Sequence, residues 1–391
     1  MPETPPPTDE PGKRRLFLHL GLQKTGTSYL QGVMRANLDR LAGQGLDVVP
    51  ADRRDTFELM LLVRERYDEQ RDPASVATAL DRFRDELDRA PGSRALLSQE
   101  SLAAARPAQI ARLLEACADR EVHVVLTVRD LGRQLPSSWQ QELKAGRTDG
   151  YRRYLQRLQA SQEAGETSHP WIHLDPPAVL ARWAGLLPAD RIHVVTVPPS
   201  GSAPTLLLER FCRVLDVDPE GLVPEERPAN TSLGRVQAEV LRRVNKELPD
   251  ELRRRQVYGD VGKRFFSSQV LSAQDGRRIR VPAEFREWCE RVADEQVATL
   301  GAAGYRVEGT LEDLRCLPSA FSDDEARPGE AEVAAAAVSA LVRILTMRAE
   351  DQRRRRGRHG HADGTGQTRL PARLWDRVRR RPARGAEAPE S

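Results

Sequence analysis

The chain is 391 residues long and carries 61 lysines and arginines against 58 acids, a net charge of +3. This length holds one large α/β domain with a tail or two smaller domains, and we expect the first arrangement. Four scattered cysteines without a Cys-x-x-Cys pair argue against a zinc site and a disulfide framework, so we expect a reduced, cytoplasmic protein that binds no metal. No apolar stretch approaches the length of a membrane span.

Charge is distributed unevenly along the chain. From Ala340 to Ser391 there are 14 arginines against six acids, which leaves the remainder mildly acidic. We expect a Pro-rich, disordered leader over residues 1–14, a folded domain over residues 15–320, and a tail over residues 321–391 that is helical at Glu330–Glu350 and then Arg-rich and disordered. Because arginine clusters bind polyanions, a non-enzymatic role for the tail stays open: contact with an anionic membrane or with nucleic acid, without sequence-specific recognition.

The predicted elements alternate between strands and helices. A first strand at Leu16–Leu20 and a helix from Ser28 to Leu41 are followed by predicted strands at Leu46–Val49, Arg94–Gln99, Glu121–Val128 and Arg191–Val197. Two further helices, separated at Pro73, are predicted within Thr56–Ala90, and another helix is predicted to begin after Pro107. The remaining predicted helices are Ser137–Lys144, Tyr151–Gln162, Ala178–Leu187, Thr205–Leu215 and Glu284–Leu300. One more helix is predicted to run to Asn245, with its N-cap supplied by the segment Asn230, Thr231 and Ser232. Residues 258–281 are expected to form a polar loop. The alternation predicts a doubly wound parallel α/β sheet with flanking helices and a helical C-terminal extension.

A Gly-rich loop joins the first strand to the first helix. It begins at Gly21 and ends at Ser28, where the helix starts with free amide donors and the positive end of its dipole. Such a loop is typical of a phosphate site. Against the Walker A pattern G-x-x-x-x-G-K-[ST] it matches at Gly21, Gly26 and Ser28, but Thr27 replaces the lysine and Lys24 lies inside the loop instead. This displacement argues against ordinary ATP or GTP hydrolysis.

Two further candidate residues directly follow predicted strands. Ligands of open α/β sheets bind beyond the carboxyl ends of the strands, where Glu100 and Arg129 are expected. A guanidinium can grip a phosphate with two hydrogen bonds. Ser137, after Pro136 at a predicted helix start, would add a hydroxyl beside free amides. Asp130 could instead act as the Walker B carboxylate of a nucleotide-dependent kinase, an alternative that stays open.

The run H-L-G-L-Q-K-T-G-T-S resembles the 5′-phosphosulfate loop of the sulfotransferases, which take a sulfuryl group from 3′-phosphoadenosine 5′-phosphosulfate (PAPS). The pairing of Arg129 with Ser137 resembles the 3′-phosphate motif of that family. The resemblance implies a P-loop-like sulfotransferase fold with PAPS as co-substrate and no metal, Lys24 as a catalytic residue, and Arg129 and Ser137 on the 3′-phosphate. For the 5′-phosphosulfate end it implies Gly21, Lys24, Thr25, Gly26, Thr27 and Ser28.

The resemblance also implies a base and an acceptor. Many eukaryotic cytosolic members carry a histidine base at this place. This chain instead has Glu100, as in the heparan sulfate type of the family, and we expect it to be the general base. The third nucleotide-binding segment of the family is not recognisable, although Lys263 and Arg264 are a weak candidate. We expect a bacterial transferase that passes a sulfuryl group to a hydroxyl or amine of a small-molecule, glycan or glycolipid acceptor.

Several conspicuous side chains have simpler explanations. His19, His123 and His193 lie in apolar strands and are expected to be hydrogen-bonded core residues. Trp139 is expected in the core. Lys144 is expected on an exposed helix surface, with contact to an anionic substrate as the alternative.

Overall fold

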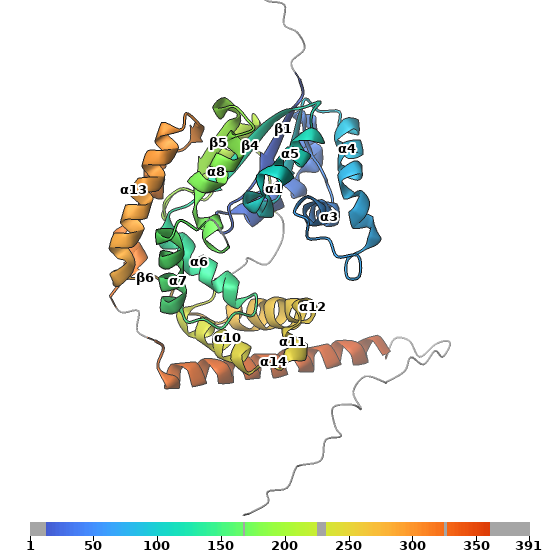
Figure 1. Cartoon of the computed structure of the whole chain (residues 1–391). Helices are drawn as coiled ribbons and strands as arrows, with labels where there is room; N and C mark the ends of the chain where they lie inside the picture. Colours follow the sequence, from blue (N-terminus) through green and yellow to red (C-terminus); the bar gives the residue numbers. More distant parts are fainter. Residues whose placement is uncertain (1–12, 167–168, 225–231, 324–326, 360–391) are drawn as a thin grey trace, which may run out of the picture. The chain divides into compact units, whose positions relative to one another are not determined.

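The computed structural model describes residues 13–166, 169–224, 232–323 and 327–359. Its centre is a six-stranded sheet in the order β2-β3-β1-β4-β5-β7, in which every neighbouring pair is parallel (Figure 1). The strands are β1 Arg15–His19, β2 Leu46–Val48, β3 Arg94–Ser98, β4 Glu121–Val128, β5 Ile192–Thr196 and β7 Arg306–Glu308; β6 Val281–Pro282 and β8 Phe321–Ser322 form a separate pair. The predicted parallel α/β class is confirmed.

Strand β1 lies at the point where the chain changes direction across the sheet. It pairs with β3 on one side and β4 on the other, so that Phe17 is opposite both Leu96 and His123. A crevice forms beyond the carboxyl ends of strands at such a switch point. The loop after β1 therefore starts in the place where the fold offers a ligand site.

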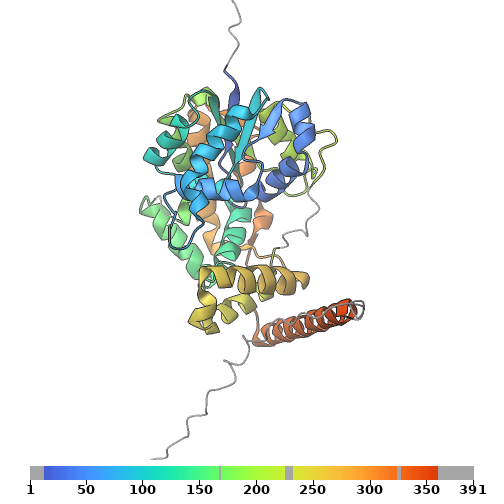
Figure 2. The same ribbon diagram turned by 90° about the vertical axis from the view of Figure 1, so that its right-hand side faces the viewer.

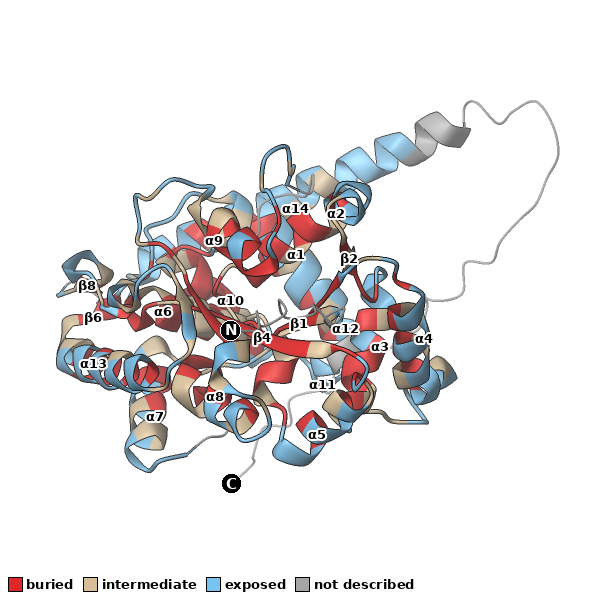
Figure 3. Ribbon diagram, turned by 90° about the horizontal axis from the view of Figure 1, so that it is seen from above, coloured by how far each residue is buried: buried red, intermediate tan, exposed pale blue. Residues whose placement is uncertain are grey.

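Helices cover both faces of the sheet, since alternate residues of a strand face opposite ways. Leu16 and Leu18 pack with the helices α3 Arg53–Val63, α4 Ala79–Arg89, α5 Pro107–Glu115 and α8 Pro176–Ala184. Phe17 packs on the other face with α1 Thr27–Ala36, α2 Leu38–Gly43 and α9 Leu206–Leu215. Figure 3 shows the resulting buried strands between exposed helix surfaces. The sheet is thus doubly wound, as predicted.

The strand histidines are core residues, as predicted. His19 is fully buried, with Nδ1 2.7 Å from Ser98 Oγ, and burial lowers its pKa to about 3. His123 Nδ1 and His193 Nε2 are 3.0 Å apart. Trp139 is also buried, and its indole N–H donates to the Asp149 carbonyl.

The remaining helices complete the fold. They are α6 Leu131–Leu143, α7 Tyr151–Glu163, α10 Arg235–Glu247, α11 Asp250–Arg253, α12 Arg255–Tyr258, the π-helix η5 Gly259–Val270, α13 Arg286–Ala302 and α14 Glu330–His359. Short 3-10 turns lie at Ala74–Thr78, Glu100–Ala104 (η2), Trp171–Leu174 (η3), Ala189–Arg191, Leu271–Ala273, Ala283–Phe285, Leu311–Leu314 and Pro318–Ala320. The edge strand β7 was not predicted, because two of its three residues, Arg306 and Glu308, are charged and no apolar run marks it.

The expectation of a polar loop at residues 258–281 is wrong for residues 258–273, which are helical, and holds for residues 274–280. Helix α12 continues into η5, seen in gold in Figure 2. Tyr258 is buried against Gly262, and its hydroxyl donates to the Leu143 carbonyl at 3.0 Å and to Asn245 Oδ1 at 2.7 Å. These long-range contacts stabilise a helix that the polar composition did not indicate.

Two predicted boundaries also differ. Helix α10 begins at Arg235 with Gly234 as its N-cap, not in the segment 230–232, of which Asn230 and Thr231 lie outside the described residues. Helix α14 runs to His359, beyond the predicted end at Glu350. Most of the expected leader and the end of the expected tail, residues 1–12 and 360–391, also lie outside the described residues.

Two further observations concern the chain as a whole. Contacts divide it into two compact units with a border between Ala337 and Val338. None of the described helices is long and apolar enough to cross a membrane.

Candidate functional site

The loop after β1 needs its two glycines. Gly21 and Gly26 have φ angles of +92° and +89°, a region that disfavours side chains. A Cβ on Gly21 would lie 2.9 Å from Glu100 Cβ, and one on Gly26 would lie 2.5 Å from Leu207 Cδ2. The loop is therefore held closely between η2 and α9, and Glu100 is placed directly against it.

The three hydroxyls of the loop have different surroundings. Thr25 is buried, and its Oγ1 donates to the Leu22 carbonyl and lies 2.6 Å from Thr127 Oγ1, so its side chain ties the loop to β4. Thr27, the first residue of α1, donates to Glu100 Oε2 at 2.7 Å. Ser28 is exposed at the helix N-terminus. Ser28 is thus the accessible hydroxyl of the three, whereas Thr27 is buried and engaged with Glu100.

Lysines from distant segments gather around Lys24. Burial first, and then the charges of Lys144, Lys263 and Arg129, lower its pKa to about 8, while the charge of Glu100 opposes them. The chain has only five lysines. Lys144 is half-buried, and burial followed by the charge of Lys263 lowers its pKa, so the expectation of an exposed helix surface is wrong. This concentration of cations indicates a site for a polyanion.

Arg129 lies beside the loop with unused hydrogen-bonding capacity. One guanidinium nitrogen donates to the Lys24 carbonyl at 3.0 Å, while Nε is buried with no hydrogen-bond partner among the described residues. Burial first, and then the charges of Arg133 and Arg278, lower the pKa of Arg129 to about 10. A buried donor without an acceptor is costly, so a ligand oxygen there would be stabilising.

Ser137 does not lie at a helix start. Helix α6 begins at Leu131, and Pro136 lies in its interior. Asp130 is the N-cap, since its carboxylate accepts from the Arg133 amide at 2.9 Å. The expectation that Ser137 stands beside free amides is therefore wrong, because a capping aspartate starts the helix six residues earlier, at Leu131. Ser137 Oγ donates to the Arg133 carbonyl at 3.2 Å; its contact with a 3′-phosphate stays a prediction.

Glu100 begins η2, directly after β3, and is half-buried. A carboxylate here could merely complement the positive end of this short helix. That position is already capped, because the Gln99 side chain accepts from the Ser101 amide. Glu100 instead contacts Thr27 of the loop and supports the charge of Lys24. Its role as the general base stays a prediction.

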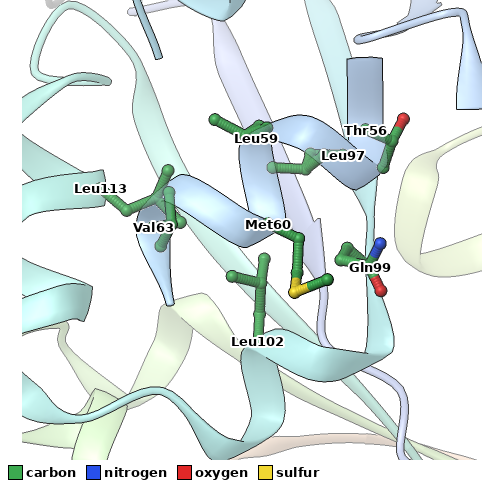
Figure 4. A pocket seen from close by; sticks show the side chains of 8 residues that line it. All are labelled: Thr56, Leu59, Met60, Val63, Leu97, Gln99, Leu102 and Leu113. Atoms are coloured by element: carbon green, nitrogen blue, oxygen red, sulfur yellow. The ribbon is translucent and has the colours of Figure 1, made fainter. Parts of the chain in front are cut away.

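Two hollows lie near the end of β3. One is an apolar gap beneath Gln99 that has no room for a water molecule, and we regard it as a packing gap and not a ligand site (Figure 4). The other is an open cavity of about 560 Å³ lined by Gln23 of the loop and by Ser101, next to Glu100. Within the described ranges, no cluster of His, Cys, Asp or Glu suits a metal ion.

The chain resembles a solved sulfotransferase. The crystal structure of the sulfotransferase from Alicyclobacillus acidocaldarius matches 74% of this chain and 95% of its own, with a TM-score of 0.41 and 14% sequence identity. A likeness this distant establishes neither the fold nor the activity. No family model and no curated protein matches the chain.

The structure brings together part of the predicted site and adds to it. Lys24, Thr27, Glu100 and Arg129 meet at the loop. Arg278 was missed because it lies in the segment 258–281, which was expected to be a polar loop. Lys144 was expected on an exposed helix surface, whereas its charge acts on Lys24. The scarcity of lysine in an arginine-rich chain was the one signal that could have found Lys144.

Proposed function

We propose that this protein is a sulfotransferase that passes a sulfuryl group from PAPS to a hydroxyl or amine. The observation that carries the proposal is the set of cations at the loop after β1. Lys24 lies in the loop and feels the charges of Lys144 on α6 and Lys263 on η5, and the Nε of Arg129, whose side chain donates to the Lys24 carbonyl, is buried without an acceptor among the described residues. A ligand with two separate phosphate groups suits these charges better than a single anion does.

Each residue has a distinct part in the proposed reaction. The loop amides, Lys24 and Thr27 would hold the 5′-phosphosulfate end, and Arg129 the 3′-phosphate. The acceptor oxygen bonds to sulfur, the bond from sulfur to the bridging oxygen breaks, and that oxygen keeps the electron pair. The acceptor proton moves to the Glu100 carboxylate. Lys24 stabilises the negative charge that grows on the leaving phosphate.

The kinase alternative is less well supported. Its carboxylate would be Asp130, but this side chain is buried, caps α6 and forms an ion pair with Arg133. A side chain committed in this way is not free to hold a nucleotide-bound Mg²⁺. The lysine that a kinase needs after the second glycine is also absent.

The choice of nucleotide tests the proposal. We expect 3′-phosphoadenosine 5′-phosphate (PAP) to raise the melting temperature without Mg²⁺, and Mg-ATP to do so weakly or not at all. A ligand at a hundredfold excess over its Kd stabilises by about 2.7 kcal/mol, which raises Tm by several degrees. Stronger stabilisation by Mg-ATP would overturn the assignment.

A variant of Arg129 tests more specifically whether the site binds a 3′-phosphate. Adenosine 5′-phosphosulfate lacks the 3′-phosphate and serves as the matched ligand. Arg129→Ala should weaken PAP binding by about tenfold or more, the value of a charge-assisted hydrogen bond, and leave adenosine 5′-phosphosulfate binding much less affected. Equal losses for both ligands would show that Arg129 only supports the loop through the Lys24 carbonyl.

A further inference from the structure

The cavity beside the loop has a composition that the proposed nucleotide site does not explain. It measures about 560 Å³, a size suited to a sugar or a similar small molecule. Segments far apart in the sequence contribute to it: the loop, the end of α3, η2, the start of α5, η3 and α8. Its lining consists of Gln23, Arg64, Arg66, Ser101, Ala104, Arg106, Pro107, His169, Ile172, His173 and Arg182.

The lining is strongly basic. It includes four arginines and, within the described residues, no aspartate or glutamate. The arginines act on one another electrostatically: burial first, and then the charges of Arg66, Arg106 and Arg182, lower the pKa of Arg64 to about 10. Of the acids near this cluster, Glu65 is paired with Arg106. The charge of Asp175 also acts on Arg182, so the surplus of positive charge around the cavity lies at Arg64 and Arg66, and such a surplus attracts an anion.

Some of these groups are held in place and others are available. Arg64 donates to the Ser101 carbonyl and to Gln109 Oε1, so the protein positions it. Arg66 is exposed; its backbone N–H donates to the Leu61 carbonyl at 2.8 Å, but its guanidinium forms no hydrogen bond or ion pair with the described residues. His173 is only 6% exposed, and its Nδ1 is buried without a hydrogen-bond partner among the described residues. Arg66 and His173 are therefore free to meet a ligand.

The cavity is structurally joined to the site of transfer. The buried Gln134 donates from one amide nitrogen to the carbonyls of Gln23 and His173, both at 2.9 Å. Ser101 of the lining follows Glu100 directly. A molecule in the cavity would thus contact Gln23 of the loop and Ser101, the residue that follows the proposed base.

We propose that this cavity is the acceptor subsite and that it selects an acceptor which already carries an oxyanion: a carboxylate, phosphate or sulfate group beside the hydroxyl that is sulfated. The inference rests on the proposed function and names its substrate class. A guanidinium binds such oxyanions with two hydrogen bonds. A neutral acceptor would leave the arginines without compensation for the water that they lose.

Matched sugars test this inference by saturation-transfer NMR, which detects weak binding without turnover. Glucuronate and glucose 6-phosphate are compared with glucose, with and without saturating PAP. We expect at least one charged sugar to bind at millimolar concentration and glucose to bind at least tenfold more weakly. The carboxylate and phosphate arms show which oxyanion is preferred. Arg66→Gln should weaken binding of the charged sugar about tenfold and leave PAP affinity unchanged.

The control variant is Arg40→Gln, an exposed arginine of α2 on the opposite face of the sheet, which removes the same charge and should change nothing. Equal binding of glucose, equal effects of the two variants, or no binding of either charged sugar at 10 mM would each overturn the inference. Failure of PAP to bind while a charged sugar binds would instead overturn the proposed nucleotide. The two failures are therefore distinguishable.

Discussion

Glu100 is the residue on which the proposed chemistry depends most. A lost general base typically costs about 10²–10⁴-fold in rate. We therefore expect Glu100→Gln, which is nearly isosteric, to lower turnover by that order while PAP affinity stays within about threefold. Turnover of PAPS and calorimetric titration of PAP measure the two quantities.

Thr27→Val is the matched control for this variant. It removes the hydrogen bond between Thr27 Oγ1 and Glu100 Oε2 but keeps the carboxylate. Because Thr27 is proposed to face the 5′-phosphosulfate, we expect this variant to weaken PAP binding. If Glu100→Gln lost PAP affinity to the same degree and kept its turnover, its role would be to hold Thr27 and not to accept a proton.

Lys24 should make ligand binding depend on pH. Burial and the neighbouring lysines lower its pKa to about 8 in the free protein, and a bound anion raises that pKa again. Binding therefore takes up a proton above about pH 8, and PAP affinity should fall by up to roughly tenfold per pH unit there. Calorimetry at pH 8.5 in two buffers of different ionisation enthalpy measures the uptake. Lys24→Arg, which stays charged, should abolish it; an unchanged uptake in that variant would assign it to another group.

At the scale of elements, the loop between β1 and α1 should tolerate no side chain at Gly21. Gly21→Ala forces a positive φ on alanine, which costs about 1–3 kcal/mol, and its Cβ would displace Glu100. We expect a lower Tm together with a loss of turnover. Gly43→Ala in α2 is the control: no atom lies within 4 Å of its added Cβ, and alanine there should raise stability by up to about 1 kcal/mol. A silent Gly21→Ala would contradict the close fit of the loop.

The elements show which structural features a sequence reveals. Strand β4 was predictable because eight residues, largely apolar and β-branched, match a central strand. The start of α6 was misplaced because Pro136 looked like a first-turn residue, whereas the Asp130 cap begins the helix earlier. The helix at Gly259–Val270 was missed because the contacts of Tyr258 with Leu143 and Asn245 join distant segments. A sequence pattern reflects interactions between residues that are close in the chain, whereas these contacts join residues that are far apart in it.

At the scale of the whole molecule, the sequence revealed the Gly-rich loop but not what surrounds it. The loop, Glu100 and Arg129 were predictable because each follows a strand. The gathering of Lys144 and Lys263 at Lys24 depends on how α6 and η5 pack. The basic cavity was hidden for the same reason, since its four arginines come from three segments that each resemble an ordinary charged surface.

The border between the two compact units predicts where the chain can be cut. Truncation after Ala337 keeps the buried Val333 and Ala336 and the bidentate pair of Arg243 with Glu330. We expect this variant to bind PAP normally with Tm within about 2 °C of the full chain. Truncation after Gly329 removes these contacts and should cost about 2 kcal/mol, or several degrees of Tm. Loss of PAP binding in the first variant would place part of the site beyond Ala337.

Transfer of label from PAPS tests the central claim most directly. The full chain is incubated with PAPS that carries a radiolabelled sulfuryl group and with fractionated small molecules from a bacterial extract, and the products are separated by chromatography. We predict that the label moves to an organic acceptor and that the rate of transfer falls about 10²–10⁴-fold in Glu100→Gln. The Arg40→Gln control should keep the rate of the unchanged protein. Label that stays on PAPS or appears only as inorganic sulfate in every fraction, with PAP bound normally, would contradict the account.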